Sequence, residues 1–249
     1  MKNTSWGKVA DWYDDVVGDP DSYQNKVILP NILRILDLKP DNTVLDVACG
    51  QGFFTQEFSK TSAKVSGIDI SEELINIAKR NSPNIAYFVS SADDLNAFSE
   101  SQFDVITITL ALQNIEKISQ VFKECYRVLK KGGRLVLVLN HPILRIPHKT
   151  SWGFDVEKKI QFRRLDSYLS ESKHEIIMNP SKKDGIKTIS FHRPLQVYVK
   201  NLANAGFTIH RLEEWTSHKV SEEGSKKVIE DTARKEFPLF MCLECKVTK

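Results

Sequence analysis

The sequence lacks the features of secreted and membrane-spanning proteins. None of its apolar runs approaches the length of about 18 residues that is needed to cross a bilayer. Its start, MKNTSWGKVADWYDD, has no apolar segment of the kind that forms the core of a signal peptide. With 249 residues, 41% of them hydrophobic and 27% charged, the composition is that of an ordinary globular chain. We therefore expect one cytoplasmic domain over residues 1–249, with no membrane partner.

Cysteine is scarce, with four residues in the chain. Cys242 and Cys245 form a C-x-x-C pair, which could indicate a redox or zinc site. The pair lies in FPLFMCLECKV, a run typical of a buried strand, and residues three apart on a strand point to opposite faces. No second C-x-x-C completes a zinc site. We therefore expect reduced, structural cysteines and no metal.

Neither sign of charge predominates in the sequence, because the net charge is only +3. This balance is too small to indicate nucleic-acid binding by itself. Residues 141–190 hold 10 Lys/Arg against 6 Asp/Glu, a local excess of four. We expect this segment to be a solvated insertion that forms a lid over the substrate; an anion-binding surface is the alternative.

Short apolar runs alternate with helical patterns from residue 44 onward. The runs predict strands over 44–48, 64–70, 85–89, 103–112 and 134–139, and helices over 53–62, 71–81 and 115–129 separate them. The last of these helices is expected to end at a cap formed by Gly132 or Gly133. Such alternation predicts an α/β fold with a doubly wound, mostly parallel sheet and helices on both faces.

The flanks of this core are less regular. Residues 1–43 contain one helical pattern, NKVILPNILRIL, that can cover a face of the sheet as an N-terminal helical cover. Residues 141–190 predict two short strands at most. A helix ending at Gly206, a strand FTIHRLEEW, a helix near 222–234 and a strand PLFMCLECKV follow, and the last two strands should close the sheet as an antiparallel edge. The complete sheet would then have seven strands, with an antiparallel last strand.

The first strand runs into a glycine turn, Asp46-Val-Ala-Cys-Gly50-Gln-Gly52, which indicates a nucleotide site. A dinucleotide fold requires a third glycine where this chain has Thr55, and a P-loop requires G-K-S/T, which is absent. A carboxylate beside a pyrophosphate would disfavour binding. The turn therefore suits a phosphate-free cofactor whose ammonium group Asp46 can help to hold.

At this point the chain resembles the class I S-adenosylmethionine-dependent methyltransferases, whose first motif reads D-x-G-x-G-x-G. The stretch YRVLKKGGRLVLV matches the R-V-L-K-P-G-G-x-L hairpin of that family, and the resemblance covers roughly residues 40–140. It implies that S-adenosyl-L-methionine is the cofactor. It also implies a seven-stranded, Rossmann-like methyltransferase domain.

The resemblance carries over residue by residue. Asp69 would accept from both ribose hydroxyls, Ile70 would pack on the adenine, and the loop VSSADDL would lie near the ring. TLALQN would line the methionine part of the cofactor. The residues expected at the cofactor are Tyr13, Asp46, Ala48, Gly50, Gln51, Gly52, Asp69, Ile70, Ala92, Asp93, Leu110 and Gln113.

The chain departs from the family at three places. Ala48 replaces the first glycine of the motif, and Ser91 stands where an Asp often accepts from the adenine amino group, a role that Asp93 could take. Gln113 and Asn114 replace a His-His pair of many relatives, so no histidine is available there.

The acceptor side must come from loops at the same sheet edge. His141, the first residue after the fifth strand, could act as a general base or could cap the strand end. Arg193 could pair a substrate carboxylate or phosphate, or could be a surface charge at a helix start. The candidates for the substrate pocket are Trp12, Asn114, Trp152, Tyr168, His192 and Arg193.

These patterns predict an enzyme that transfers a methyl group from S-adenosylmethionine to a small molecule by in-line displacement. The acceptor atom and the oligomeric state are not readable from the sequence. Two alternatives stay open: an RNA-modifying methyltransferase that uses the basic segment 141–190, and a non-catalytic protein that binds the cofactor.

Overall fold

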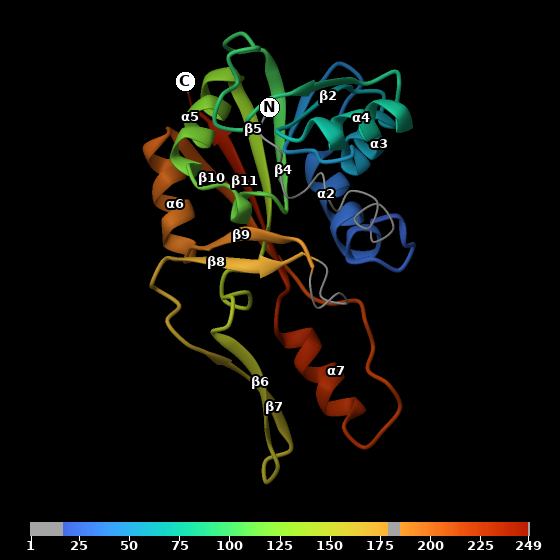
Figure 1. Ribbon diagram of the computed structural model, residues 1–249, viewed down its shortest axis with the longest axis vertical. Coiled ribbons are helices and arrows are strands. Elements are labelled where there is room, and N and C mark those ends of the chain that lie inside the picture. Colours follow the sequence, from blue (N-terminus) through green and yellow to red (C-terminus); the bar gives the residue numbers. More distant parts are fainter. Residues whose placement is uncertain (1–16, 179–184, 249) are drawn as a thin grey trace.

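A computed structural model describes residues 17–178 and 185–248, and its centre is one seven-stranded sheet with helices on both faces (Figure 1). The strand order is β10-β11-β5-β4-β1-β2-β3. The strands are β1 (Thr43–Val47), β2 (Lys64–Asp69), β3 (Ala86–Val89), β4 (Phe103–Thr109), β5 (Leu129–Asn140), β10 (Phe207–Trp215) and β11 (Phe240–Val247). The predicted fold class is confirmed.

The directions of the strands show which edge of the sheet is expected to bind a ligand. β1 pairs in parallel with β2 and with β4, while β2–β3 and β4–β5 are also parallel. The chain runs outward through β2 and β3 and then crosses back to β4 on the other side of β1. The strand order therefore reverses between β1 and β4, and the carboxyl ends of these strands form the edge where open α/β sheets bind ligands.

The last two strands of the chain close one edge of the sheet and the last strand is antiparallel, as predicted. β11 pairs antiparallel with both β5 and β10, so β10 is the edge strand. This position explains why FMCLECKV is almost continuously buried, because both of its sides are hydrogen-bonded and both faces are covered.

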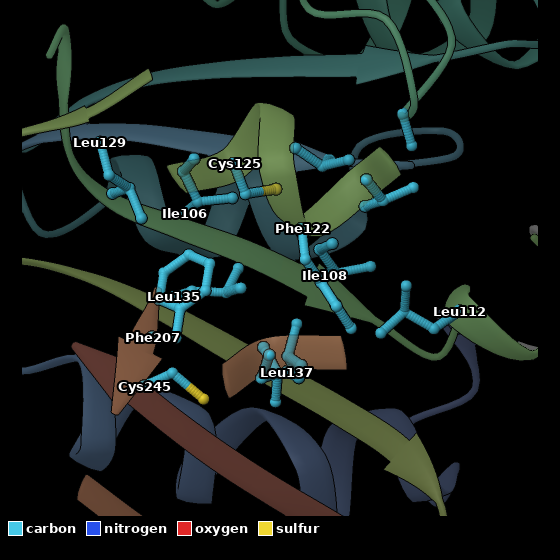
Figure 2. Packing of buried hydrophobic residues seen from close by; sticks show 14 of the residues in the cluster. Ile106, Ile108, Leu112, Phe122, Cys125, Leu129, Leu135, Leu137, Phe207 and Cys245 are labelled. Carbon is cyan, nitrogen blue, oxygen red and sulfur yellow. The ribbon is translucent and has the colours of Figure 1, made fainter. Parts of the chain in front are cut away.

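Alternating strand residues feed two separate cores. One face packs on α5 (Ile118–Val128) and α6 (Leu195–Asn204), as Figure 2 shows in part; the other packs on α2 (Leu29–Leu36) and α3 (Phe53–Ser59). Cys245 lies in the first core and Cys242 in the second, and both thiols are free. The prediction that the C-x-x-C sulfurs diverge is confirmed.

The remaining helices lie at the margins of the two cores. α4 (Glu72–Asn81) packs beside β3 and is capped by the Ser71 hydroxyl, which accepts from the Leu74 amide, while α7 (Lys227–Glu236) lies beside the insertion. The N-terminal pattern forms a π-helical turn, η2 (Gln24–Ile28), that continues into α2. Within the described residues, no helix is long and apolar enough to cross a membrane.

The end of α5 differs from the prediction. The helix ends at Val128, and Leu129 is already extended and pairs with Phe103 on β4. The glycines therefore do not cap the helix but lie within β5, where Gly132 has a positive φ of 73°. Pairing with β4 overrides the helical pattern at its last residue.

The insertion contains more regular structure than predicted. It holds two antiparallel hairpins, β6 (Thr150–Asp155) with β7 (Ile160–Leu165), and β8 (Ser172–Ile177) with β9 (Lys187–His192). In β7 and β8 most residues alternate between partly buried and exposed, a period-two pattern that charged residues disguise in the sequence. In Figure 1 the first hairpin projects away from the sheet, and the second lies across its lower end.

Candidate functional site

A cavity of about 850 Å³, including its open mouth, lies at the carboxyl ends of β1, β2 and β4. Its walls come from the glycine turn after β1, the end of β2, the start of α3 and the segment after β4. The residues that line it are Val17, Asp46, Ala48, Cys49, Gly50, Gln51, Phe53, Phe54, Asp69, Ile70, Leu74, Thr109, Leu110, Ala111, Asn114 and Ile115.

The glycine turn forms one wall of the cavity, and its backbone adopts positive φ angles that residues with a side chain rarely adopt. Gly50 and Gly52 have φ angles of 58° and 84°, and a Cβ on Gly52 would lie 2.5 Å from the Tyr87 hydroxyl oxygen. Ala48 also adopts a positive φ, 56°, although it is not a glycine. A left-handed alanine costs about 1–2 kcal/mol, and such strain is concentrated at ligand sites.

Asp69 ends β2 at the rim of this wall. Its carboxylate accepts from the Gly50 amide through Oδ2 and from the Ser71 amide through Oδ1, both at 2.9 Å. Burial raises the pKa of Asp69, while the backbone N–H groups of Ser71, Gly50 and Ile70 oppose the increase. These bonds fix the position of the side chain, which lines the cavity. Because each carboxylate oxygen has a further lone pair, both oxygens can still accept a hydrogen bond from a ligand.

Asp46 lies deeper in the same wall. Its Oδ2 accepts from the Thr55 hydroxyl at 2.6 Å and its Oδ1 from the Thr107 hydroxyl at 2.9 Å. Burial raises the pKa of Asp46 to about 6, and the nearby Asp69 contributes to the increase while the two threonines oppose it. The residue that replaces the third glycine, Thr55, therefore holds the acid of the motif.

The opposite wall follows β4. Leu110 has a φ of 57° and donates its amide to the Val138 carbonyl at 2.7 Å, and a 3-10 helix, η3 (Leu112–Asn114), comes next. The Thr109 hydroxyl is buried and has no hydrogen-bond partner among the described residues. A ligand in the cavity could supply one.

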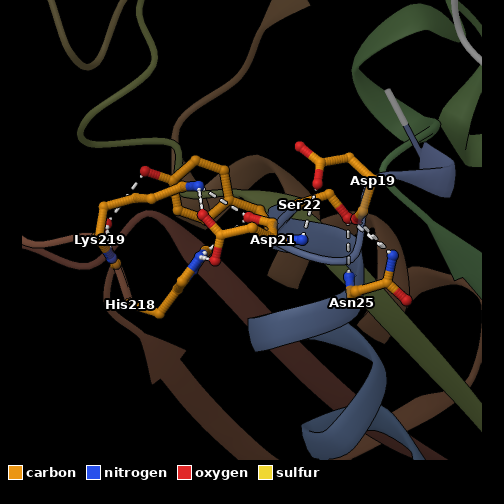
Figure 3. A network of polar contacts seen from close by, with 8 residues as sticks. Asp19, Asp21, Ser22, Asn25, His218 and Lys219 are labelled. Atoms are coloured by element: carbon orange, nitrogen blue, oxygen red, sulfur yellow. Dashed lines mark hydrogen bonds and ion pairs between the residues drawn. The ribbon is translucent and has the colours of Figure 1, made fainter. Parts of the chain in front are cut away.

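Val17 reaches the cavity from the N-terminal segment, and a polar network holds it there (Figure 3). Asn25 donates to the Val17 carbonyl at 2.9 Å, and Asp21 pairs with His218 and Lys219 on the loop after β10. The network therefore ties the segment before η2 to the loop after β10.

The structure brings eight of the predicted residues to the cavity and leaves others away from it. Those at the cavity are Asp46, Ala48, Gly50, Gln51, Asp69, Ile70, Leu110 and Asn114. Gly52, Ala92, Asp93 and Gln113 do not line it; Gln113 instead donates to the Asn140 carbonyl at 3.1 Å. Trp12 and Tyr13 lie outside the described residues.

Sequence reasoning missed the apolar part of the lining, which includes Val17, Phe53, Phe54 and Ile115. Such residues give no polar signal. The position of Phe53 and Phe54 directly after the glycine turn could have indicated them.

His141 lies away from the cavity. Its ring is 2% exposed, its Nε2 lies 2.7 Å from Glu214 Oε1, and its Nδ1 accepts from the Ile143 amide at 3.3 Å. Burial lowers the pKa of His141, and the nearby Glu214 opposes the decrease. Since both ring nitrogens are engaged, the geometry supports the strand-end interpretation and not the general base.

We expect His141→Ala to lower the free energy of unfolding by about 2 kcal/mol, because it removes a buried ring and a hydrogen bond to a carboxylate. The affinity for S-adenosylhomocysteine should stay within twofold of wild type. Urea unfolding and calorimetry measure the two quantities, and a large loss of affinity with little loss of stability would return His141 to the site.

The other substrate candidates of the insertion make structural contacts. His192 Nε2 lies 2.7 Å from the Tyr168 carbonyl oxygen, and the Tyr168 hydroxyl accepts from the Leu195 amide at 3.0 Å. Trp152 packs edge-on against Phe237 of the segment after α7. None of these side chains lines the cavity.

Arg193 fits neither of its two interpretations. It is only 5% exposed, so it is not a surface charge, and its guanidinium donates to the carbonyls of Leu112, Ile115 and Glu116. Those bonds occupy the groups that would bind a substrate anion. The prediction of an anion-binding role is therefore not supported.

Comparisons with known proteins bear on the family and the fold. A family model described as a methyltransferase domain matches residues 45–137. A ubiquinone biosynthesis O-methyltransferase from Xanthomonas oryzae pv. oryzae is 33% identical over 131 residues, covering 51% of this chain and 54% of that protein. A demethylmenaquinone methyltransferase from Lactococcus lactis subsp. lactis is 39% identical over 113 residues, covering 42% and 44%.

The chain thus spans about half the length of these curated relatives. A crystal structure of an S-adenosylmethionine-dependent methyltransferase from Mesorhizobium loti superposes with a TM-score of 0.68 at 24% identity, covering 87% of this chain and 96% of that one. That likeness shows the fold over almost the whole of the described chain.

Proposed function

Because residues 45–137 form a methyltransferase domain of the class I, Rossmann-like, S-adenosylmethionine-dependent family, we propose that the chain methylates a small molecule. The observation that carries the proposal is the buried Asp69 carboxylate at the rim of the cavity, held by the Gly50 and Ser71 amides. It offers two acceptor oxygens to a diol at the carboxyl end of β2.

The cavity fits S-adenosylmethionine, which supplies a methyl group that its sulfonium already activates. Asp69 would accept from the ribose hydroxyls and Ile70 would pack on the adenine. Asp46 would face the ammonium, and the turn from Ala48 to Gln51 lets the backbone approach closely. The unpartnered Thr109 hydroxyl is a further polar group for the ligand to satisfy.

The rest of the lining suits an apolar acceptor. Apolar side chains also line the cavity, among them Val17, Phe53, Phe54 and Ile115, and Asn114 is a polar lining residue. The matched relatives are named for ubiquinone biosynthesis and for demethylmenaquinone, and both of these compounds carry a quinone ring. We therefore propose a ring-bearing, largely apolar small molecule as the acceptor.

Alignment of the reactants is what this site can contribute to the reaction. The ionisable side chains among the described lining residues are Asp46, Cys49 and Asp69. Burial raises the pKa of Cys49 well above its usual range, and both carboxylates are held by donors. In-line displacement would then depend mainly on proximity and orientation, with no described side chain placed as a general base.

The RNA-modifying alternative finds little support in the insertion. Lys158, Arg164 and Lys187 each pair with an acidic neighbour, at 3.9, 3.1 and 2.7 Å. The local excess of positive charge is therefore partly neutralised and does not form a continuous basic surface on these residues.

Calorimetry with S-adenosylhomocysteine tests the cofactor, and we expect binding with one site per chain. Methyl transfer to a panel of phenols and quinols, followed by mass spectrometry, tests the acceptor class. Absence of S-adenosylhomocysteine binding would overturn the proposal. Binding without transfer to any acceptor would favour the non-catalytic alternative, and salt-dependent binding of bulk tRNA would favour the RNA alternative.

A further inference from the structure

The segment SFHRPLQ connects β9 to α6, and its arginine reaches across to the cavity wall. Arg193 Nη1 lies 3.2 Å from the Leu112 carbonyl oxygen, and Nη2 lies 2.8 Å from those of Ile115 and Glu116. The three acceptors belong to one stretch, which starts in η3 and leads toward α5. One buried guanidinium therefore bridges the insertion to the segment after β4.

The chemistry of this contact favours arginine over other cations. The carbonyl groups at the end of a helical turn carry partial negative charge, which a guanidinium complements. Arg193 Cζ lies 4.8 Å above the Phe191 ring, and its Nε lies 4.0 Å from Glu171 Oε2. A planar fork that stacks on a ring while it donates to several carbonyls cannot be reproduced by lysine.

The wall that Arg193 touches contains strained backbone. Leu110, at the cavity, is a branched residue in the left-handed region, which costs about 1–2 kcal/mol. Such a conformation persists only where its surroundings fix it. Asn114, which also lines the cavity, donates its side-chain amide to the Ile189 carbonyl on β9 at 2.9 Å, so the same hairpin holds the wall at a second point.

We propose that Arg193 is a positioning residue for the methyl-transfer site. By binding the carbonyls of Leu112, Ile115 and Glu116, it fixes the wall over residues 109–115 in the shape that receives the cofactor. Cofactor affinity then depends on an arginine that does not touch the cavity. The inference rests on the proposed function in one respect, that the cavity is the cofactor site.

Arg193→Met and Arg193→Lys, compared with Arg163→Met, test the inference. Arg163 is a matched control on β7: its Nη2 donates to the Leu144 carbonyl at 3.1 Å and to the Thr150 hydroxyl at 2.7 Å, and its Cζ lies 5.1 Å above the Trp152 ring. S-adenosylhomocysteine affinity is measured by calorimetry, well below the unfolding temperature of each variant. We expect a loss of about tenfold for Arg193→Met, about fivefold for Arg193→Lys and less than twofold for Arg163→Met.

Hydrogen exchange of the wall gives a second measurement, which needs only a folded protein. The amides of Leu110, Asn114 and Ile115 donate to the carbonyls of Val138 on β5, of Ala111 and of Leu112, respectively. In Arg193→Lys we expect them to exchange about fivefold faster than in wild type, while amides of β1 and β2 stay unchanged. If Arg193→Met fails to fold, hydrogen exchange in Arg193→Lys still tests whether Arg193 holds the wall.

Wild-type affinity in Arg193→Met would overturn the inference, as would an equal loss in Arg163→Met or unchanged exchange in Arg193→Lys. Failure of wild type to bind S-adenosylhomocysteine would instead overturn the proposed function. The exchange measurement would then still show whether Arg193 holds the wall.

Discussion

Replacement of Asp69 by alanine is expected to reduce the affinity for S-adenosylhomocysteine by about 100-fold, or about 3 kcal/mol. The carboxylate offers two acceptor oxygens at the rim of the cavity, and hydrogen bonds to a charged group contribute about 1.5–3 kcal/mol each. Alanine removes both oxygens and also leaves the Gly50 and Ser71 amides without their acceptor. Calorimetry on the purified variant measures the loss.

Asp69→Asn should lie between alanine and wild type. An amide keeps one acceptor oxygen, but its NH2 group must face either the Gly50 or the Ser71 amide, which are both donors. We expect a loss of about tenfold or more in affinity, together with a lower melting temperature.

Asp104 supplies a matched control for these variants. It accepts from the Thr43 amide at 2.8 Å and pairs with Lys130, but it lies at the amino end of β4, opposite the cavity. Asp104→Ala should therefore destabilise the fold and leave the S-adenosylhomocysteine affinity within twofold. Equal losses of affinity in both alanine variants would mean that Asp69 acts only through stability.

The fold and the cofactor wall could be predicted because their signals are local. Short apolar runs, the helix patterns that separate them and a glycine turn after β1 define a doubly wound sheet with its site at the strand ends. Asp46 lies at the end of β1, directly before the glycine turn, and Asp69 is the last residue of β2; the role of Asp69 came from the family resemblance. The opposite faces of Cys242 and Cys245 follow from strand geometry alone.

The acceptor side could not be predicted in the same way. His141 and Arg193 each precede a proline and His192 precedes Arg193, and these sequence positions do not reveal that all three residues are buried. Their partners, such as Glu214 and the carbonyls after β4, are distant in sequence. Long-range contacts of this kind engage polar side chains within the protein, so that they are not available to a ligand.

Asp46 gives the second large effect, and it depends on pH. Burial disfavours the ionised form of Asp46 and raises its pKa in the folded protein to about 6, above the usual value for an aspartate. The folded protein therefore retains this proton at pH values where the unfolded chain has lost it. Ionisation of Asp46 then costs stability, and that cost grows between about pH 4 and pH 6 and is complete above pH 6.

Asp46→Asn removes this titration while it retains a polar group of the same size between Thr55 and Thr107. Relative to wild type, the variant should gain up to about 3 kcal/mol in unfolding free energy between pH 4 and pH 7.5. The comparison uses the pH dependence of the difference, so that a constant cost from the altered hydrogen bonds cancels. Urea unfolding at several pH values measures it, and a difference that does not change with pH would show that Asp46 is ionised without cost.

The same titration should appear in cofactor binding, because an ammonium group near Asp46 favours the ionised carboxylate. At pH 6, S-adenosylhomocysteine binding to wild type should release a fraction of a proton, and binding to Asp46→Asn should release correspondingly less. Calorimetry in two buffers with different ionisation enthalpies measures the number of protons. Equal release in both proteins would place the ammonium away from Asp46 and leave this acid as a support, held by Thr55 and Thr107, beneath the glycine turn.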